Sequence, residues 1–144
     1  NYIIKEYPDL IMITDKMVIG DGLCIKSRPD VLIHFNKHTV IIEIDEDQHK
    51  YLNKNCDQPR INNIQEALNR PIVIIRFNPD CYLDDGKKIK SCFNIDKKTG
   101  LRTIPKSQLD NWNNRLLELT KTISDHIEYD NDDPIKIIKL FYDT

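Results

Sequence analysis

The segment TVIIEID, residues 39–45, ends a run of apolar residues in two carboxylates, Glu43 and Asp45. Because successive side chains of a strand point to opposite faces, Ile41, Glu43 and Asp45 are expected to share one face. Carboxylates crowded together beside an apolar interior are costly unless a cation compensates their charge. The pattern therefore predicts that Glu43 and Asp45 share a cation.

A third carboxylate is expected at the same place. Asp30 stands near the start of RPDVLIHF, residues 28–35, and the short polar connection NKH suits an antiparallel hairpin between this strand and residues 39–45. A hairpin brings the start of its first strand beside the end of its second, so Asp30 should lie near Glu43 and Asp45. Three oxygen ligands on rigid strands suit Mg²⁺ or Mn²⁺. The alternative is a set of solvated acids at a strand end.

Gln48 and His49 follow the same strand within a few residues. An imidazole close to a metal-bound water can orient or deprotonate that water, because its ordinary pKa is near neutral pH. The candidate catalytic residues are therefore Asp30, Glu43, Asp45, Gln48 and His49. A supporting or surface role for His49 is the alternative.

The surrounding segments predict a mixed sheet. LIMITDKMVIGDG, residues 10–22, is typical of a strand or hairpin that closes on a glycine turn. Asp57 and Pro59 favour a helix start, and Asn69 with Pro71 favours its end. PIVIIRF, which starts at Pro71, is a continuous apolar strand of the fully buried kind. The order strand, strand, helix, strand implies a right-handed helical crossover.

The second half of the chain has a different character. Residues 84–106 are rich in turn residues and lysines, and they predict a short surface hairpin. Residues 106–127 are amphipathic at helical spacing, which predicts a helix with Trp112 in its apolar stripe. The short segment 134–143 closes the chain. We expect a single domain over residues 1–144, with its core at about 10–82 and a basic hairpin and C-terminal helices over 83–144.

Composition excludes several classes of protein. The 144 residues are 40% hydrophobic and 31% charged, which fits a globular domain and argues against disorder. No apolar run approaches the roughly 18 residues that cross a bilayer, and no signal peptide is expected. An intracellular protein (in the nucleus, the cytoplasm or a viral factory), not a secreted or membrane protein, is expected. The four cysteines form no CxxC pair, which favours free thiols over a zinc site. Because the chain begins at Asn1, it is expected to be part of a longer protein or a trimmed one.

The motifs together resemble the PD-(D/E)xK nuclease superfamily, in particular the branch of the very-short-patch repair (Vsr-like) endonucleases. The resemblance rests on RPD, then EIDEDQH with Glu43 thirteen residues after Asp30, then CDQPRINNIQEAL and PIVIIRFNPD. The resemblance covers about residues 26–82. The chain is also similar to uncharacterised proteins of large DNA viruses and some protists. It implies an α/β fold, a restriction-endonuclease-like mixed central sheet flanked by helices, with a C-terminal helical extension.

The resemblance also implies metal-dependent hydrolysis of a DNA phosphodiester. Asp30 and Glu43 would bind Mg²⁺ or Mn²⁺, Asp45 would be a third ligand, and His49 would serve acid–base chemistry. Supporting or phosphate-contacting roles fall to three further residues, Arg60, Arg76 and Asn78. The chain departs from the family where Asp45 stands in place of the usual lysine, while Gln48 lies in the region where that lysine would act.

A polyanionic substrate requires cations around the acidic site. Lys26 and Arg28 precede Asp30, and Lys87 and Lys88 begin the later lysine-rich segment, so these residues are candidates for DNA contact. A solvated surface is the alternative for the lysines. DNA is the expected partner, and a homodimer is a further possibility.

Four functions are consistent with these residues. A metal-dependent DNA endonuclease of the nicking, repair or homing type is the first. The second is an exonuclease or RNA-directed nuclease on the same core. The third is a catalytically inactive DNA-binding module that keeps the nuclease fold, which the missing lysine favours. The fourth is a scaffold whose acids bind metal only structurally.

Overall fold

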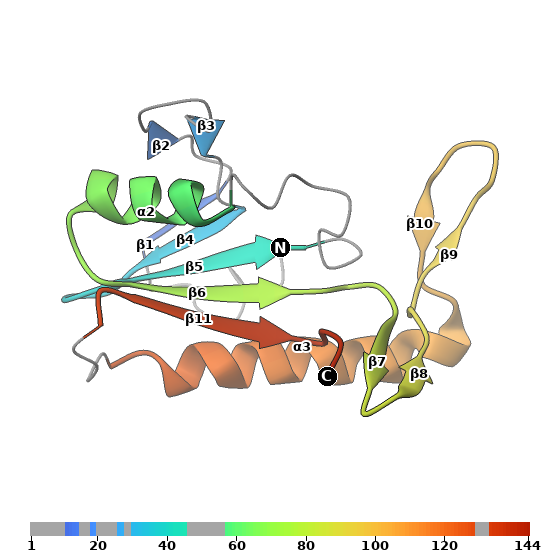
Figure 1. Ribbon diagram of the computed structural model, residues 1–144. Helices are drawn as coiled ribbons and strands as arrows, with labels where there is room; N and C mark the ends of the chain where they lie inside the picture. The colour runs from blue at the N-terminus through green and yellow to red at the C-terminus, as the bar shows by residue number, and fades with distance from the viewer. Residues whose placement is uncertain (1–10, 15–17, 20–25, 28–29, 46–56, 129–132) are drawn as a thin grey trace.

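The computed structural model describes residues 11–14, 18–19, 26–27, 30–45, 57–128 and 133–144. Their main feature is a mixed five-stranded sheet in the order β1-β4-β5-β6-β11 (Figure 1). The bounds of its strands are β1 (Ile11–Thr14), β4 (Val31–His34), β5 (Thr39–Ile44), β6 (Ile72–Phe77) and β11 (Ile135–Leu140). The chain is therefore mixed α/β, as the sequence predicts.

Strand directions follow the expected order of elements. β4 pairs antiparallel with both β1 and β5, and the β4–β5 hairpin aligns Val31 with Ile42. β6 runs parallel to β5, with α2 (Asp57–Leu68) between them in the chain, so a helical connection joins the two strands as predicted. The carboxyl ends of the parallel strands β5, β6 and β11 consequently lie at the same end of the sheet (Figure 1).

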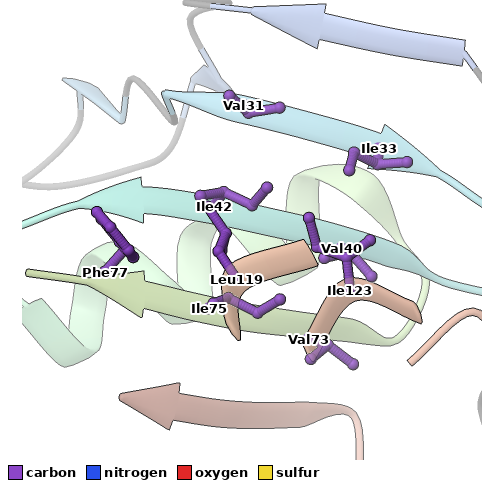
Figure 2. Packing of buried hydrophobic residues seen from close by; sticks show 9 residues of the cluster. All are labelled: Val31, Ile33, Val40, Ile42, Val73, Ile75, Phe77, Leu119 and Ile123. Carbon is purple, nitrogen blue, oxygen red and sulfur yellow. The ribbon is translucent and has the colours of Figure 1, made fainter. Parts of the chain in front are cut away.

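Two apolar layers cover the two faces of the sheet. Ile41 and Ile74 face α2, where Ile61 and Ile64 pack against them. Figure 2 shows the opposite layer, where Leu119 and Ile123 of α3 (Leu109–Asp125) cover the alternate residues of the same strands, Val31, Ile33, Val40, Ile42, Val73, Ile75 and Phe77. Burial of each such side chain contributes about 1.5–3 kcal/mol. Successive side chains of β5 therefore pack on opposite faces of the sheet. This alternation places Glu43 on the same face as Ile41, the face that α2 covers.

The second half of the chain differs from its prediction in two ways. The lysine-rich segment forms two hairpins instead of one: β7 (Tyr82–Asp84) with β8 (Lys87–Ile89), and β9 (Asn94–Ile95) with β10 (Arg102–Thr103). The expected C-terminal helical extension is only partly helical. It holds the 3₁₀ helix η3 (Lys106–Gln108) and α3, but β11 joins the sheet beside β6, because its backbone completes the ladder of a central strand that is buried along its whole length.

Two short strands near the N-terminus, β2 (Val18–Ile19) and β3 (Lys26–Ser27), pair with each other apart from the main sheet. The segment predicted as one strand or hairpin is therefore divided between β1 and β2. In the described ranges, no helix has the length and apolar character needed to span a membrane.

Candidate active site

Three acids lie near one another at the end of the sheet where β5 and β6 terminate. Glu43 is the next-to-last residue of β5 and Asp45 follows the strand, where its backbone N–H donates to the Phe77 carbonyl at 2.8 Å. Asp30 immediately precedes β4, and its Oδ2 accepts a hydrogen bond of 2.7 Å from the backbone N–H of Ile44. Since Ile44 stands between the other two acids in the chain, the hairpin brings the three carboxyl-bearing residues together.

Glu43 and Asp45 are buried, with 4% and 0% of their surface exposed. The Arg60 guanidinium donates to Glu43 Oε1 at 2.6 Å, and Arg76 Nε donates to Asp45 Oδ2 at 2.6 Å. Arg60 reaches the site from the first turn of α2, and Arg76 stands opposite Glu43 in the parallel register of β5 and β6. Two arginines therefore supply the positive charge that the sequence requires beside these carboxylates.

Burial has a clear electrostatic consequence for Glu43. Desolvation raises its pKa to about 7, although Arg60 acts in the opposite direction by charge and by hydrogen bonding. The negative charges of Asp30 and Asp45 raise the Glu43 pKa further. Asp30 and Asp45 are therefore close enough to Glu43 to affect its charge.

The pKa of Glu43 predicts how stability varies with pH. The folded protein holds the Glu43 proton up to about pH 7, whereas the unfolded chain releases it near 4.5, so stability should fall as pH rises between these values. Glu43→Gln removes this dependence. From pH 4 to pH 8, the glutamine variant should gain on the order of 3 kcal/mol relative to wild type. Urea unfolding in EDTA at both pH values measures the gain, and parallel pH curves for the two proteins would contradict it.

The donor set fits a hard divalent cation in kind, because all three side chains offer carboxylate oxygens and two of the three, Glu43 and Asp45, are buried. The three carboxylates do not form a preorganised metal-binding site. Within the described part of the chain, no three His, Cys, Asp or Glu side chains are grouped closely enough to hold an ion. A cation at Glu43 would have to exchange with the Arg60 guanidinium, which already binds that carboxylate.

The other predicted site residues have different contacts or fall outside the described residues. Asn78 is buried, and its amide Nδ2 donates to the carbonyls of Phe141 at 2.9 Å and Cys81 at 3.1 Å, so it orders the turn after β6. Lys87 and Lys88 are exposed on β8. The predictions for Arg28, Gln48 and His49 fall outside the described residues, and of Lys26 only the backbone in β3 is described.

The structure adds two residues that sequence reasoning missed. The Tyr142 hydroxyl donates a hydrogen bond to Asp45 Oδ2, and burial together with this bond raises the Tyr142 pKa, so the hydroxyl keeps its proton. Lys139 pairs in register with Arg76, and its ammonium lies 5.4 Å from the centre of the Tyr142 ring. Sequence reasoning could have placed these two residues at the site only by predicting that residues 135–140 form a strand parallel to β6.

A buried arginine fixes the hairpins relative to the sheet. Arg115 of α3 is 5% exposed and donates to the carbonyls of Asn78, Asp80 and Lys90 at 2.9–3.2 Å. Its guanidinium also lies 5.0 Å from the centre of the Phe141 ring. The base of the β7–β8 hairpin is therefore joined to the helix that covers the sheet.

Comparisons with known proteins find no matching family model, no similar curated protein and no similar solved structure. Function is therefore inferred from the chemistry and placement of the residues described above.

Proposed function

We propose that this chain is a metal-dependent DNA endonuclease domain of the PD-(D/E)xK type. The observation that carries the proposal is the placement of Asp30 near Glu43 and Asp45, from the two adjacent strands of one hairpin, at one end of a mixed sheet. Acids that only solubilise a strand end would not need burial. Here two of the three are almost fully buried, which is costly without a function or a structural partner.

The order of elements supports the same proposal. A hairpin that presents the acids, a helix, and a parallel strand follow one another, and helices cover both faces of the sheet. This is compatible with the restriction-endonuclease-like sheet that the sequence motifs imply. The proposed metal ligands, Asp30, Glu43 and Asp45, all come from its second and third strands and the residues that flank them.

When bound, Mg²⁺ or Mn²⁺ would neutralise charge that develops on the phosphate and lower the pKa of an attacking water. The chain's own residues position this chemistry. Arg76 and the Tyr142 hydroxyl orient the Asp45 carboxylate, while the Ile44 N–H orients Asp30. His49 remains the proposed acid–base residue.

A second function is favoured by a specific observation. Arg60 and Arg76 already compensate Glu43 and Asp45, and Asp45 stands where the family usually has a lysine. A DNA-binding module that retains the fold without turnover would need no other cation at this place.

Cleavage of supercoiled plasmid DNA separates the two functions. With Mg²⁺ or Mn²⁺ the chain should convert supercoiled DNA to the nicked or linear form, and excess EDTA should stop the reaction, because metal supplies the charge neutralisation. Linear DNA, single-stranded DNA and RNA, tested in parallel, distinguish an exonuclease or an RNA-directed enzyme. Salt-sensitive DNA binding with no product at any concentration of either metal would contradict the nuclease and favour the binding module.

A further inference from the structure

Positive charge is concentrated in one segment of this acidic chain. Residues 86–106 hold seven lysines and arginines against one acid, Asp96, although the whole chain has a net charge of −2. The six lysines of the segment are exposed. This segment carries the β9–β10 hairpin, which projects from the body of the protein beyond the carboxyl ends of β5 and β6 (Figure 1).

The turn of the β9–β10 hairpin is well ordered by its own hydrogen bonds. Asp96 Oδ1 accepts from the backbone N–H of Lys98 at 2.8 Å and of Thr99 at 3.3 Å. The Gly100 N–H donates to the Asp96 carbonyl at 2.8 Å, and Gly100 has φ +71°, a value that favours glycine. The Asp96 N–H closes the turn on the Leu101 carbonyl at 2.9 Å. The turn is thus closed by hydrogen bonds within the hairpin itself.

The base of the hairpin is attached to the body of the protein. Arg102 donates to Asp80 Oδ1 at 2.8 Å, and its guanidinium lies 5.8 Å from the centre of the Phe93 ring. Phe93 in turn packs edge-on against Trp112 of α3, with ring centres 4.8 Å apart. These contacts fix where the hairpin stands relative to the acids.

Two large apolar side chains are exposed on this ordered hairpin. Ile95 is 58% exposed and Leu101 is 63% exposed, and the two flank Lys97 and Lys98. They contribute little to the core, and an ordered element that presents them to water loses less entropy when it binds a partner. The combination of exposed apolar residues with lysines suits a surface that is both charged and locally apolar.

We propose that the β9–β10 hairpin is an arm that enters the major groove of double-stranded DNA. Lys97 and Lys98 contact phosphates across the groove, and Ile95 and Leu101 contact base edges, including thymine methyl groups. The choice of DNA rests on the proposed function; the choice of a duplex rests on shape. A major groove about 12 Å wide admits a two-stranded β-ribbon, whereas the deep, narrow major groove of duplex RNA does not.

Binding is measured by fluorescence anisotropy with a labelled DNA duplex of about 25 base pairs in EDTA, so that no cleavage takes place. Lys97→Glu and Lys98→Glu should each weaken binding and reduce the slope of log K against log salt by about 1. Ile95→Ser and Leu101→Ser should weaken binding roughly five- to tenfold and leave that slope unchanged, because they remove apolar contacts only.

Two control variants are matched in exposure and chemistry. Leu117→Ser changes a leucine of α3 that is 60% exposed, and Lys121→Glu reverses a charge on the exposed side of the same helix. Both control variants should bind the DNA duplex with the affinity of wild type, whereas the hairpin variants should bind it more weakly. Circular dichroism of all six variants should match wild type, since each site is exposed.

The proposal is overturned if the hairpin variants bind the DNA duplex like their controls, or if an RNA duplex of the same sequence binds as tightly as DNA. The outcome is independent of the nuclease proposal. Duplex binding that depends on the hairpin, without any nicking, would support the proposed DNA-binding arm and contradict the nuclease proposal. If the hairpin variants still nick DNA and bind the duplex with unchanged affinity, the nuclease proposal is supported and the proposed arm is contradicted.

Discussion

Replacing Asp30 by asparagine or Glu43 by glutamine should reduce Mg²⁺- or Mn²⁺-dependent nicking by about a thousandfold or more. Both substitutions preserve the size of the side chain and a hydrogen-bond acceptor. The Ile44 N–H can still donate to the amide oxygen of the asparagine, and Arg60 can still donate to that of the glutamine, so the fold should survive. What is lost is the negative charge that would bind a divalent ion. Initial rates of plasmid nicking at saturating metal measure the effect.

Glu118→Gln is the matched control, because Glu118 is an exposed acid on α3 away from the three carboxylates. Its nicking rate should equal that of wild type. Calorimetric titration with Mn²⁺ gives a second readout, in which the Asp30 and Glu43 variants should lose the binding heat that the control keeps. Full nicking by both variants would remove the proposed site.

Glu43 joins function to stability in a way that a purely structural acid would not. Its charge is unfavourable in the folded protein, since burial raises its pKa to about 7. The substitution that abolishes nicking should therefore make the metal-free protein gain stability relative to wild type as the pH rises from 4 to 8. Opposite changes in activity and stability are typical of residues kept for chemistry.

The placement of the acids could be predicted because it depends on local rules. Alternation along residues 39–45 puts Glu43 on the face of Ile41, and a short hairpin puts Asp30 beside the end of that strand. The fully buried character of β6 was also readable from its continuous apolar sequence. Each inference uses contacts between residues close in the sequence.

The partners of the acids could not be predicted in the same way. Arg60 and Arg76 are obvious cations in the sequence, and the resemblance implies phosphate contacts for them. Their ion pairs depend on the register of β5 with β6 and on how α2 lies across the sheet. Tyr142 is 97 residues from Asp45, and nothing local links the two.

Strand β11 shows why the C-terminal segment was hard to interpret. In IKIIKL, apolar residues and lysines follow neither a clean alternation nor a helical stripe, because β11 is an edge strand whose two faces meet different surroundings. Ile138 and Leu140 pack on the α3 side, whereas Ile137 is 41% exposed. Only pairing with β6 decides its conformation.

Arg76→Met should lower the free energy of unfolding by about 3–5 kcal/mol, because it leaves the fully buried Asp45 carboxylate without the guanidinium that compensates it. The double variant Asp45→Asn with Arg76→Met should recover much of this loss, since it removes both charges. Urea unfolding at pH 7.5 in EDTA measures both values.

A more exposed pair of the same chemistry provides the comparison. Arg102 binds Asp80 at 2.8 Å, but the Arg102 side chain is 31% exposed, so Arg102→Met should cost only about 1 kcal/mol or less. If Arg76→Met were equally mild, water or another cation would have to reach Asp45, and the site would be more open than its burial implies. A large loss that the double variant reverses would show that the charge of Asp45 is tolerated only because a cation is held beside it. That requirement is the same one that a metal ion would satisfy.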